Sequence, residues 1–152
     1  MRWALAATLL IAAAPLMAKE RLGAYQRWAA FKDAEIPRCY AIGSPDESSG
    51  TGGYVSIGFW PKRGLGHQLS VRLSRTRSNN AGITLSVGGR RFQLTTDGDT
   101  GRAKDRAMDL AIIAAIRSSP SMSVQSSGIT DAYALRGAAS AIDAAALGCA
   151  RK

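Results

Sequence analysis

Two cysteines, one histidine and two closely spaced aspartates are the residues that could carry chemistry in this 152-residue chain. Cys39 lies in the stretch EIPRCYAIGSP, and Cys149 lies three residues from the C-terminus. A catalytic thiol needs a histidine partner to form the thiolate, but nothing local ties His67, the only histidine, to Cys39. A zinc site needs about four ligands. Neither a nucleophile nor a zinc site therefore explains the cysteines.

The first 18 residues, MRWALAATLLIAAAPLMA, have the layout of a secretory signal peptide. Arg2 supplies the positive start, an uncharged apolar stretch follows, and Pro15 ends it ahead of a short segment. We predict cleavage after Ala18, which leaves a single domain over residues 19–152. An uncleaved anchor is the alternative, although the run is shorter than the roughly 18 apolar residues of a spanning helix. We expect a periplasmic protein, with envelope association or secretion as further options.

In an exported protein two cysteines usually pair with each other. We therefore predict a structural disulfide between Cys39 and Cys149 that fastens the C-terminal helix to the first strands. In the chain-entropy model, closing a loop of this size removes about 4 to 5 kcal/mol of unfolded-state freedom. A bridge between two chains of a dimer is the alternative, and the oligomeric state stays open.

Strict alternation of apolar and polar residues predicts a first β-hairpin, formed by YVSIGFW (54–60) and HQLSVRLSR (67–75). Pairing Ile57 with Val71 places all the apolar side chains of both strands on one side. A second hairpin joins ITLSV and RRFQL through Gly88-Gly89, with Ile83 opposite Leu94. Further strands are predicted in RWAAF, RCYAI, MSVQS and AYALR. Six to eight short strands indicate a mainly β fold of α+β type, an antiparallel sandwich or a partly open barrel.

Two segments have helical spacing instead. In residues 100–120 apolar positions such as Leu110 recur at helical intervals, and Thr100 or Asp99 could cap the start. The second segment, AASAIDAAALGCA (138–150), is short and rich in alanine. Such a helix is marginal alone, and a disulfide at its end is one way to hold it.

The remaining motifs predict no cofactor and no metal. Asp97 and Asp99 resemble the start of a calcium loop, but Gly101 and Met108 stand where such a loop needs oxygen ligands. A turn between a strand and a helix is the simpler interpretation. No serine-elbow or Ser-x-x-Lys spacing occurs, and His67 is expected at the surface, at the end of a hairpin loop.

The charge balance is the one compositional anomaly. Without Arg2 the chain has 19 basic and 11 acidic residues, a net charge of +8. Several arginines fall in the strands with their side chains directed away from the core, a pattern that suits a polyanion or an anionic lipid headgroup. The alternative is that they only keep a basic protein soluble. The candidate anionic-ligand face consists of Arg72, Arg91, Arg75, Trp60 and Tyr54.

Taken in order, these segments resemble the invasion-associated locus B family of exported proteobacterial proteins. The resemblance begins at Trp28 and CYAIGSP, continues through YVSIGFWP, HQLSVRL and FQLTTDGDTG, and ends in AAIRSSPSMSVQSSG, TDAYALRGAASAIDAA and Cys149. Ser118, Ser119 and Pro120 stand where this family often has a glycine, and Gln68 replaces a commonly acidic residue. The resemblance implies a periplasmic or cell-envelope protein, linked in pathogenic relatives to entry into host cells, and it supplies no catalytic motif.

The leading hypothesis is thus a non-catalytic binding or envelope-associated module rather than an enzyme. Its expected partner is an anionic envelope component or another envelope protein, and nucleic acid is not expected outside the cytoplasm. Two alternatives stay open: a hydrolase whose serine or aspartate site forms only in three dimensions, and a passive structural component of the envelope.

The intact mass of protein purified from the periplasm tests export and the disulfide together. We expect the loss of residues 1–18 and a gain of about 2 Da on reduction, from the two hydrogens that open one disulfide. An unchanged mass on reduction would mean free thiols.

Overall fold

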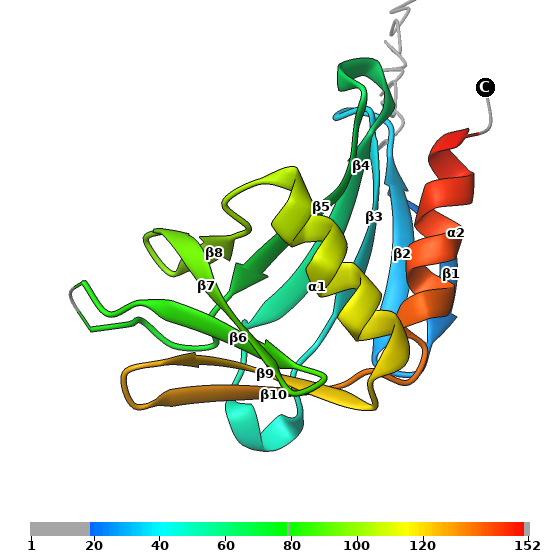
Figure 1. Cartoon of the computed structure of the whole chain (residues 1–152). Coiled ribbons are helices and arrows are strands. Elements are labelled where there is room, and N and C mark those ends of the chain that lie inside the picture. Colours follow the sequence, from blue (N-terminus) through cyan, green and yellow to red (C-terminus); the bar gives the residue numbers. More distant parts are fainter. Residues whose placement is uncertain (1–18, 79, 151–152) are drawn as a thin grey trace, which may run out of the picture.

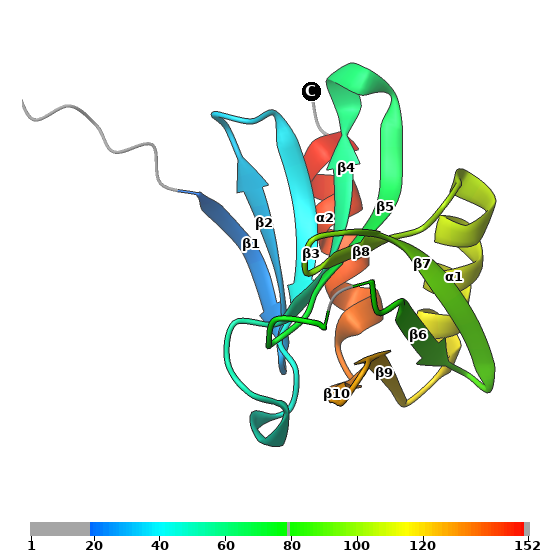
Figure 2. The same ribbon diagram turned by 90° about the vertical axis from the view of Figure 1, so that its left-hand side faces the viewer.

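The structure, a computed structural model, describes residues 19–78 and 80–150, so the predicted signal peptide lies outside the described residues. Ten antiparallel strands form one open, curved sheet, and both helices lie on the same side of it (Figures 1 and 2). The strands are β1 (Glu20–Tyr25), β2 (Trp28–Asp33), β3 (Arg38–Gly43), β4 (Tyr54–Trp60), β5 (Leu65–Arg72), β6 (Ile83–Val87), β7 (Arg90–Asp97), β8 (Thr100–Arg102), β9 (Ser121–Ser126) and β10 (Ile129–Ala134). The helices are α1 (Arg106–Ser118) and α2 (Ala138–Ala150), with short 3₁₀ turns at Glu47–Ser49 and Pro61–Arg63.

The strands run in the order β1-β2-β3-β4-β5-β8-β7-β6-β9-β10. The prediction of a mainly β fold with two helices, one of them tethered by a disulfide, is confirmed. The sheet has ten strands rather than six to eight, and it is one open sheet rather than the two packed sheets of a sandwich. The two extra strands escape the sequence pattern because β8 has three residues and β1 begins with two charged ones.

The β6–β7 hairpin has the predicted register. Ile83 pairs with Leu94, and Ser86 pairs with Arg91. Gly88 and Gly89 have φ values of +58° and +73°, the left-handed conformation that the central residues of a tight hairpin turn require.

The β4–β5 hairpin keeps the predicted faces but not the predicted register. Ile57 pairs with Leu69 instead of Val71, a displacement of two residues, which leaves every side chain on its expected side. The cause lies at the loop end, where a 3₁₀ turn at Pro61–Arg63 shortens the connection and a register shift occurs between Gly58 and Trp60. Alternation alone does not encode either feature.

Helix α1 begins six residues later than its predicted cap at Thr100. Thr100 belongs to β8, and the carboxylate of Asp105 caps the helix by accepting a 2.8 Å hydrogen bond from the Met108 amide. The buried side of the helix is formed by its isoleucines, Ile112 among them, whereas Leu110 is 43% exposed. The predicted apolar face was therefore right at Ala115, Ile112 and Ile116 and wrong at Leu110, because the buried side is centred on the isoleucines.

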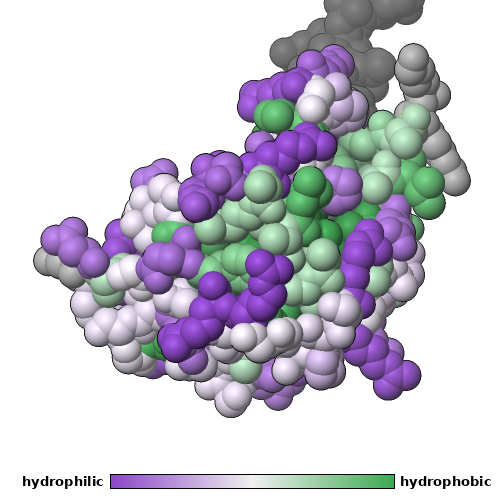
Figure 3. Space-filling model, in the orientation of Figure 1, coloured by the Kyte–Doolittle hydropathy of each residue, from purple (hydrophilic) through white to green (hydrophobic). Residues whose placement is uncertain are grey.

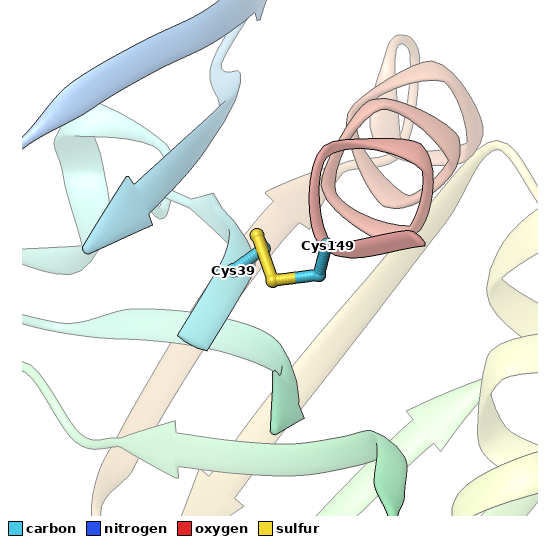
Figure 4. Close-up of a disulfide and its surroundings, with 2 residues drawn as sticks. All are labelled: Cys39 and Cys149. Atoms are coloured by element: carbon cyan, nitrogen blue, oxygen red, sulfur yellow. A yellow bond between two sulfur atoms is a disulfide. The ribbon is translucent and has the colours of Figure 1, made fainter. Parts of the chain in front are cut away.

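Helix α2 has the predicted bounds and lies against β1, β2 and β3. A disulfide joins Cys149 near its end to Cys39 on β3, with a Cα–Cα distance of 5.7 Å (Figure 4). Ala141 and Ala145 are fully buried, and a Cβ on Gly148 would overlap Leu22 of β1. Small side chains thus let the helix approach the sheet closely. No helix among the described residues is long and apolar enough to span a bilayer.

The edge of the sheet at β10 is closed by polar contacts rather than by another strand. Ala132 donates its amide to Ser49 Oγ (3.0 Å), and its carbonyl accepts a 2.7 Å hydrogen bond from the Asp46 amide. The buried Trp28 donates its indole N–H to the Ala134 carbonyl at 2.9 Å. These contacts satisfy backbone groups that an edge strand would otherwise expose.

Removing the disulfide tests how far α2 depends on it. We expect a Cys39→Ala, Cys149→Ala variant to lose about 2 to 4 kcal/mol of unfolding free energy, because the open chain gains conformational freedom. Amide hydrogen exchange should rise first in α2. Equal stability of this variant and the oxidised parent in urea would contradict the dependence.

Candidate functional site

The structure brings two of the five predicted face residues into direct contact distance along one row of the sheet. Tyr54 on β4 and Arg72 on β5 are register partners on the side facing away from the helices. Arg102 on β8 is a diagonal neighbour of Arg72 on the same side, because it pairs with Ser70. Tyr54, Arg72 and Arg102 therefore form a local cluster.

Trp60 lies on the same outer side, toward the other end of β4. Its ring lies directly over Gly58, where any Cβ would overlap it. Gly58 is also the register partner of Tyr40 on β3. A glycine at position 58 thus makes room for an indole beside the next strand.

Two further aromatic rings, which were not predicted as part of the face, continue this row. Phe31 on β2 and Tyr40 are register partners whose ring centroids lie 5.6 Å apart. The guanidinium of Arg38 lies 4.8 Å from the Tyr40 centroid, and the ammonium of Lys19 lies 5.9 Å from it. These are cation–π distances. The signal was present in the alternation of both strands, but their pairing was needed to see it.

We call this surface the aromatic-basic face. It is the outer side of β2–β5 and β8, and it consists of Phe31, Tyr40, Trp60, Tyr54, Arg38, Arg72 and Arg102.

The arginines of this face differ in how far their charges are already paired. Arg38 lies 3.8 Å from the buried carboxylate of Asp33. Within residues 19–78 and 80–150, no carboxylate lies within 4.0 Å of Arg72 or Arg102. The charges of Arg72 and Arg102 are therefore available to a ligand.

The other two predicted residues lie elsewhere. Arg75 is exposed in the loop after β5. Arg91 is six residues from Asp97 on β7, the residue that aligns with Arg72 through Thr100, so it lies roughly 20 Å away along the strand. Arg91 lines a separate open cavity of 710 Å³ between the outer sides of β6, β9 and β10. Arg72 and Arg91 consequently do not share one local surface.

His67 is not a simple surface residue. It is half-buried in β5 with φ at +57°, and its ring meets Phe59 edge to face at 4.9 Å. Burial lowers the pKa of His67 below 6.5, the nearby charges of Arg117 and Arg106 lower it further, and Asp109 opposes them. Desolvation in turn raises the pKa of Asp109, whose carboxylate accepts a 2.9 Å hydrogen bond from the Leu69 amide.

The His67–Asp109 pair does not complete a hydrolase-like site in the part of the chain described. A cavity of 220 Å³ lies beside Asp109, and its lining contains no serine. The carboxylate that does contact a serine is Asp131, which is fully buried and accepts a 2.8 Å hydrogen bond from the Ser74 amide as well as one from the Ser74 hydroxyl. Asp131 ties β10 to the end of β5 and is remote from any histidine contact.

Tyr133, next along the inner side of β10, has its pKa raised by burial and by the negative charge of Asp131. The residues described include no group of three or more histidine, cysteine or acidic side chains placed to hold a metal ion.

Exposed apolar side chains gather on the opposite side of the molecule. Figure 3 shows green surface among purple side chains on the side that carries both helices. Leu110 of α1 and Leu147 of α2 are 43% and 59% exposed there. The two sides of the molecule therefore offer different chemistry.

Comparison of the chain with models of protein families, with curated proteins and with solved structures found no match.

The single histidine makes its own titration a direct test of the site geometry. By NMR we expect His67 to titrate below pH 6.5, and an Arg117→Gln substitution to raise its pKa, since a repelling charge is removed. Because the folded state binds this proton less readily than the unfolded chain, His67 contributes stability above pH 6.5 that is lost as the pH falls toward its lowered pKa. A titration midpoint at or above 6.5 would contradict the burial described.

Proposed function

We propose that this chain is an exported, non-catalytic binding module of the cell envelope that binds an anionic partner through the aromatic-basic face. The observation that carries the proposal is the cluster of Tyr54, Arg72 and Arg102, whose cations have no carboxylate partner among the described residues. Unpaired cations beside aromatic rings favour anionic headgroups and polyanions, because the charges attract and the rings contribute contact area.

Three features support a binding role over the alternatives. The net charge of +8 after removal of Arg2 favours encounter with anionic surfaces. A passive structural component would not need unpaired arginines next to half-buried aromatic rings. Ser74, the serine that contacts Asp131, ties the end of β5 to β10, and His67 lies near Asp109 instead, so no observation favours a hydrolase.

The periplasmic location rests on the sequence of residues 1–18 and on the resemblance to the invasion-associated locus B family. In pathogenic relatives that family is linked to host-cell entry, and an envelope module with an anionic partner is compatible with such a role. We also propose the exposed apolar side chains over α1 and α2 as the surface for a second envelope protein.

Charge reversal on the face tests the proposal. Each basic residue near an anionic membrane contributes about 1 kcal/mol, so an Arg72→Glu, Arg102→Glu variant should bind phosphatidylglycerol-containing vesicles at least tenfold more weakly. Sedimentation with vesicles of phosphatidylglycerol and phosphatidylcholine measures the bound fraction, with pure phosphatidylcholine as the uncharged reference.

The matched control is Arg106→Glu, Arg136→Glu, which makes the same change in net charge at exposed positions outside the face. An equal loss of binding by the control would mean that only the overall charge matters, and it would overturn the assignment of the face. Unchanged binding by the Arg72, Arg102 variant would overturn it as well.

A further inference from the structure

A trough crosses the outer side of β7, β6, β9 and β10, away from the aromatic-basic face. Its floor is a single row of register partners: Arg91 pairs with Ser86, Ser86 with Ser123, and Ser123 with Ala132. All four residues line the 710 Å³ cavity. The trough exists because three consecutive members of this row have small side chains, whereas Gln125 stands higher in the neighbouring row.

The dimensions of the trough fit a short linear ligand. Three strand spacings separate Arg91 from Ala132, which is about 14 Å at roughly 4.8 Å per spacing. The volume lies within the range of ordinary ligand sites, about 300 to 1,000 Å³. A di- or trisaccharide or a peptide of similar length could lie along such a floor.

The two ends of the trough carry opposite charges, and only the negative one has a partner of opposite charge within the protein. At the β7 end, Arg91 has no carboxylate within 4.0 Å among the residues described, whereas the guanidinium of Arg90 lies on the inner side, 4.8 Å over the Phe92 ring. At the β10 end, Asp46 is already shared with Arg27 at 4.0 Å. The free charge in the trough is therefore positive and sits at one end.

The floor between the ends offers hydroxyl and amide groups. Ser86, Ser123 and Gln125 are half-buried, and no side-chain hydrogen bond engages them within residues 19–78 and 80–150. Such groups both donate and accept, as ligand hydroxyls do. An acyl chain would have to cover the hydroxyls of Ser86 and Ser123 without giving them a hydrogen-bond partner, which costs free energy.

A peptide is disfavoured for a different reason. Peptides gain affinity at a sheet mainly by adding a strand to its edge. At the β10 edge both backbone groups of Ala132 and the carbonyl of Ala134 already have partners. An extended peptide would have to lie on the side-chain surface without that pairing.

We propose that this trough binds a short anionic saccharide, with its anionic group on Arg91 and its hydroxyls on Ser86, Ser123 and Gln125. The site is separate from the aromatic-basic face, and it goes beyond the proposed function by adding a second ligand class. It does not depend on vesicle binding, because none of its residues belongs to that face.

Titration with trigalacturonate, a carboxylated trisaccharide, tests the proposal by amide NMR and calorimetry. We expect chemical-shift changes along β6, β7 and β9, and at least tenfold weaker binding by Arg91→Gln, since a charged hydrogen bond is lost. Ser123→Leu, which fills the floor without changing charge, should weaken binding as well. The matched control, Arg106→Gln, removes the same charge outside both the trough and the aromatic-basic face and should leave the affinity unchanged.

Maltotriose and inorganic phosphate separate the two parts of the ligand. We expect both to bind more weakly than trigalacturonate, because one lacks the anion and the other lacks the hydroxyl-bearing chain. Phosphate binding as tight as trigalacturonate would overturn the saccharide assignment. Equal weakening by Arg106→Gln and Arg91→Gln, or the absence of shifts in β6 and β9, would overturn the site itself.

Discussion

The disulfide between Cys39 and Cys149 holds in place the helix on which the covering of the sheet depends. A single open sheet has one apolar side and nothing but helices to cover it. Helix α2 covers β1 to β3, yet most of its buried residues are alanines, which bury little area each. The same small residues allow α2 to pack closely on the sheet, but each of them contributes little hydrophobic stabilisation. A covalent link across 110 residues offsets this weakness by restricting the unfolded chain.

The segments near the two ends of the described chain depend on each other in a second way. Trp28, at the start of β2, is buried and donates to the carbonyl of Ala134, at the end of β10. Ser49 and Asp46, from the loop before β4, bond to the same edge at Ala132. The sheet curves back until its last strand meets loops from its first half (Figure 2). Contacts of such long sequence separation make the fold non-local, a topology expected to fold slowly.

Most local features of this fold could be predicted, and among the non-local ones only the disulfide could. The Gly88-Gly89 turn allows one tight register, so the β6–β7 pairing could be derived from residues a few positions apart. The predicted β4–β5 register was wrong because the alternation of apolar and polar residues gives no sign of the 3₁₀ turn after Trp60. Strand β8 is only three residues long, and it contains Thr100, which was predicted to cap helix α1. The disulfide could be predicted without any geometry, from the presence of only two cysteines and from the predicted export of the chain.

The candidate sites show the same division. Alternation correctly placed Tyr54 and Arg72 on the outer side of the sheet, but it carries no information on position within the plane of the sheet. Arg91 lies far from Arg72 because Asp97, at the other end of β7, is the residue that aligns with Arg72 through Thr100 of β8. The trough needs residues from β6, β7, β9 and β10 in one row, and no local pattern relates Ser86 to Ser123 or Ala132.

The arginines of this basic chain differ in whether a carboxylate of the protein lies beside them. Arg27, Arg38 and Arg117 have carboxylates within 4.0 Å, so their charges are partly neutralised within the protein. Arg72, Arg91 and Arg102 have none in the described ranges, and all three lie on the sheet side that the helices leave open. Covering the inner side with α1 and α2 is thus what frees the outer side to bind. Because the length of β7 separates Arg91, beside serines, from Arg72 and Arg102, beside an aromatic ring, a single excess of charge can serve two different ligand chemistries.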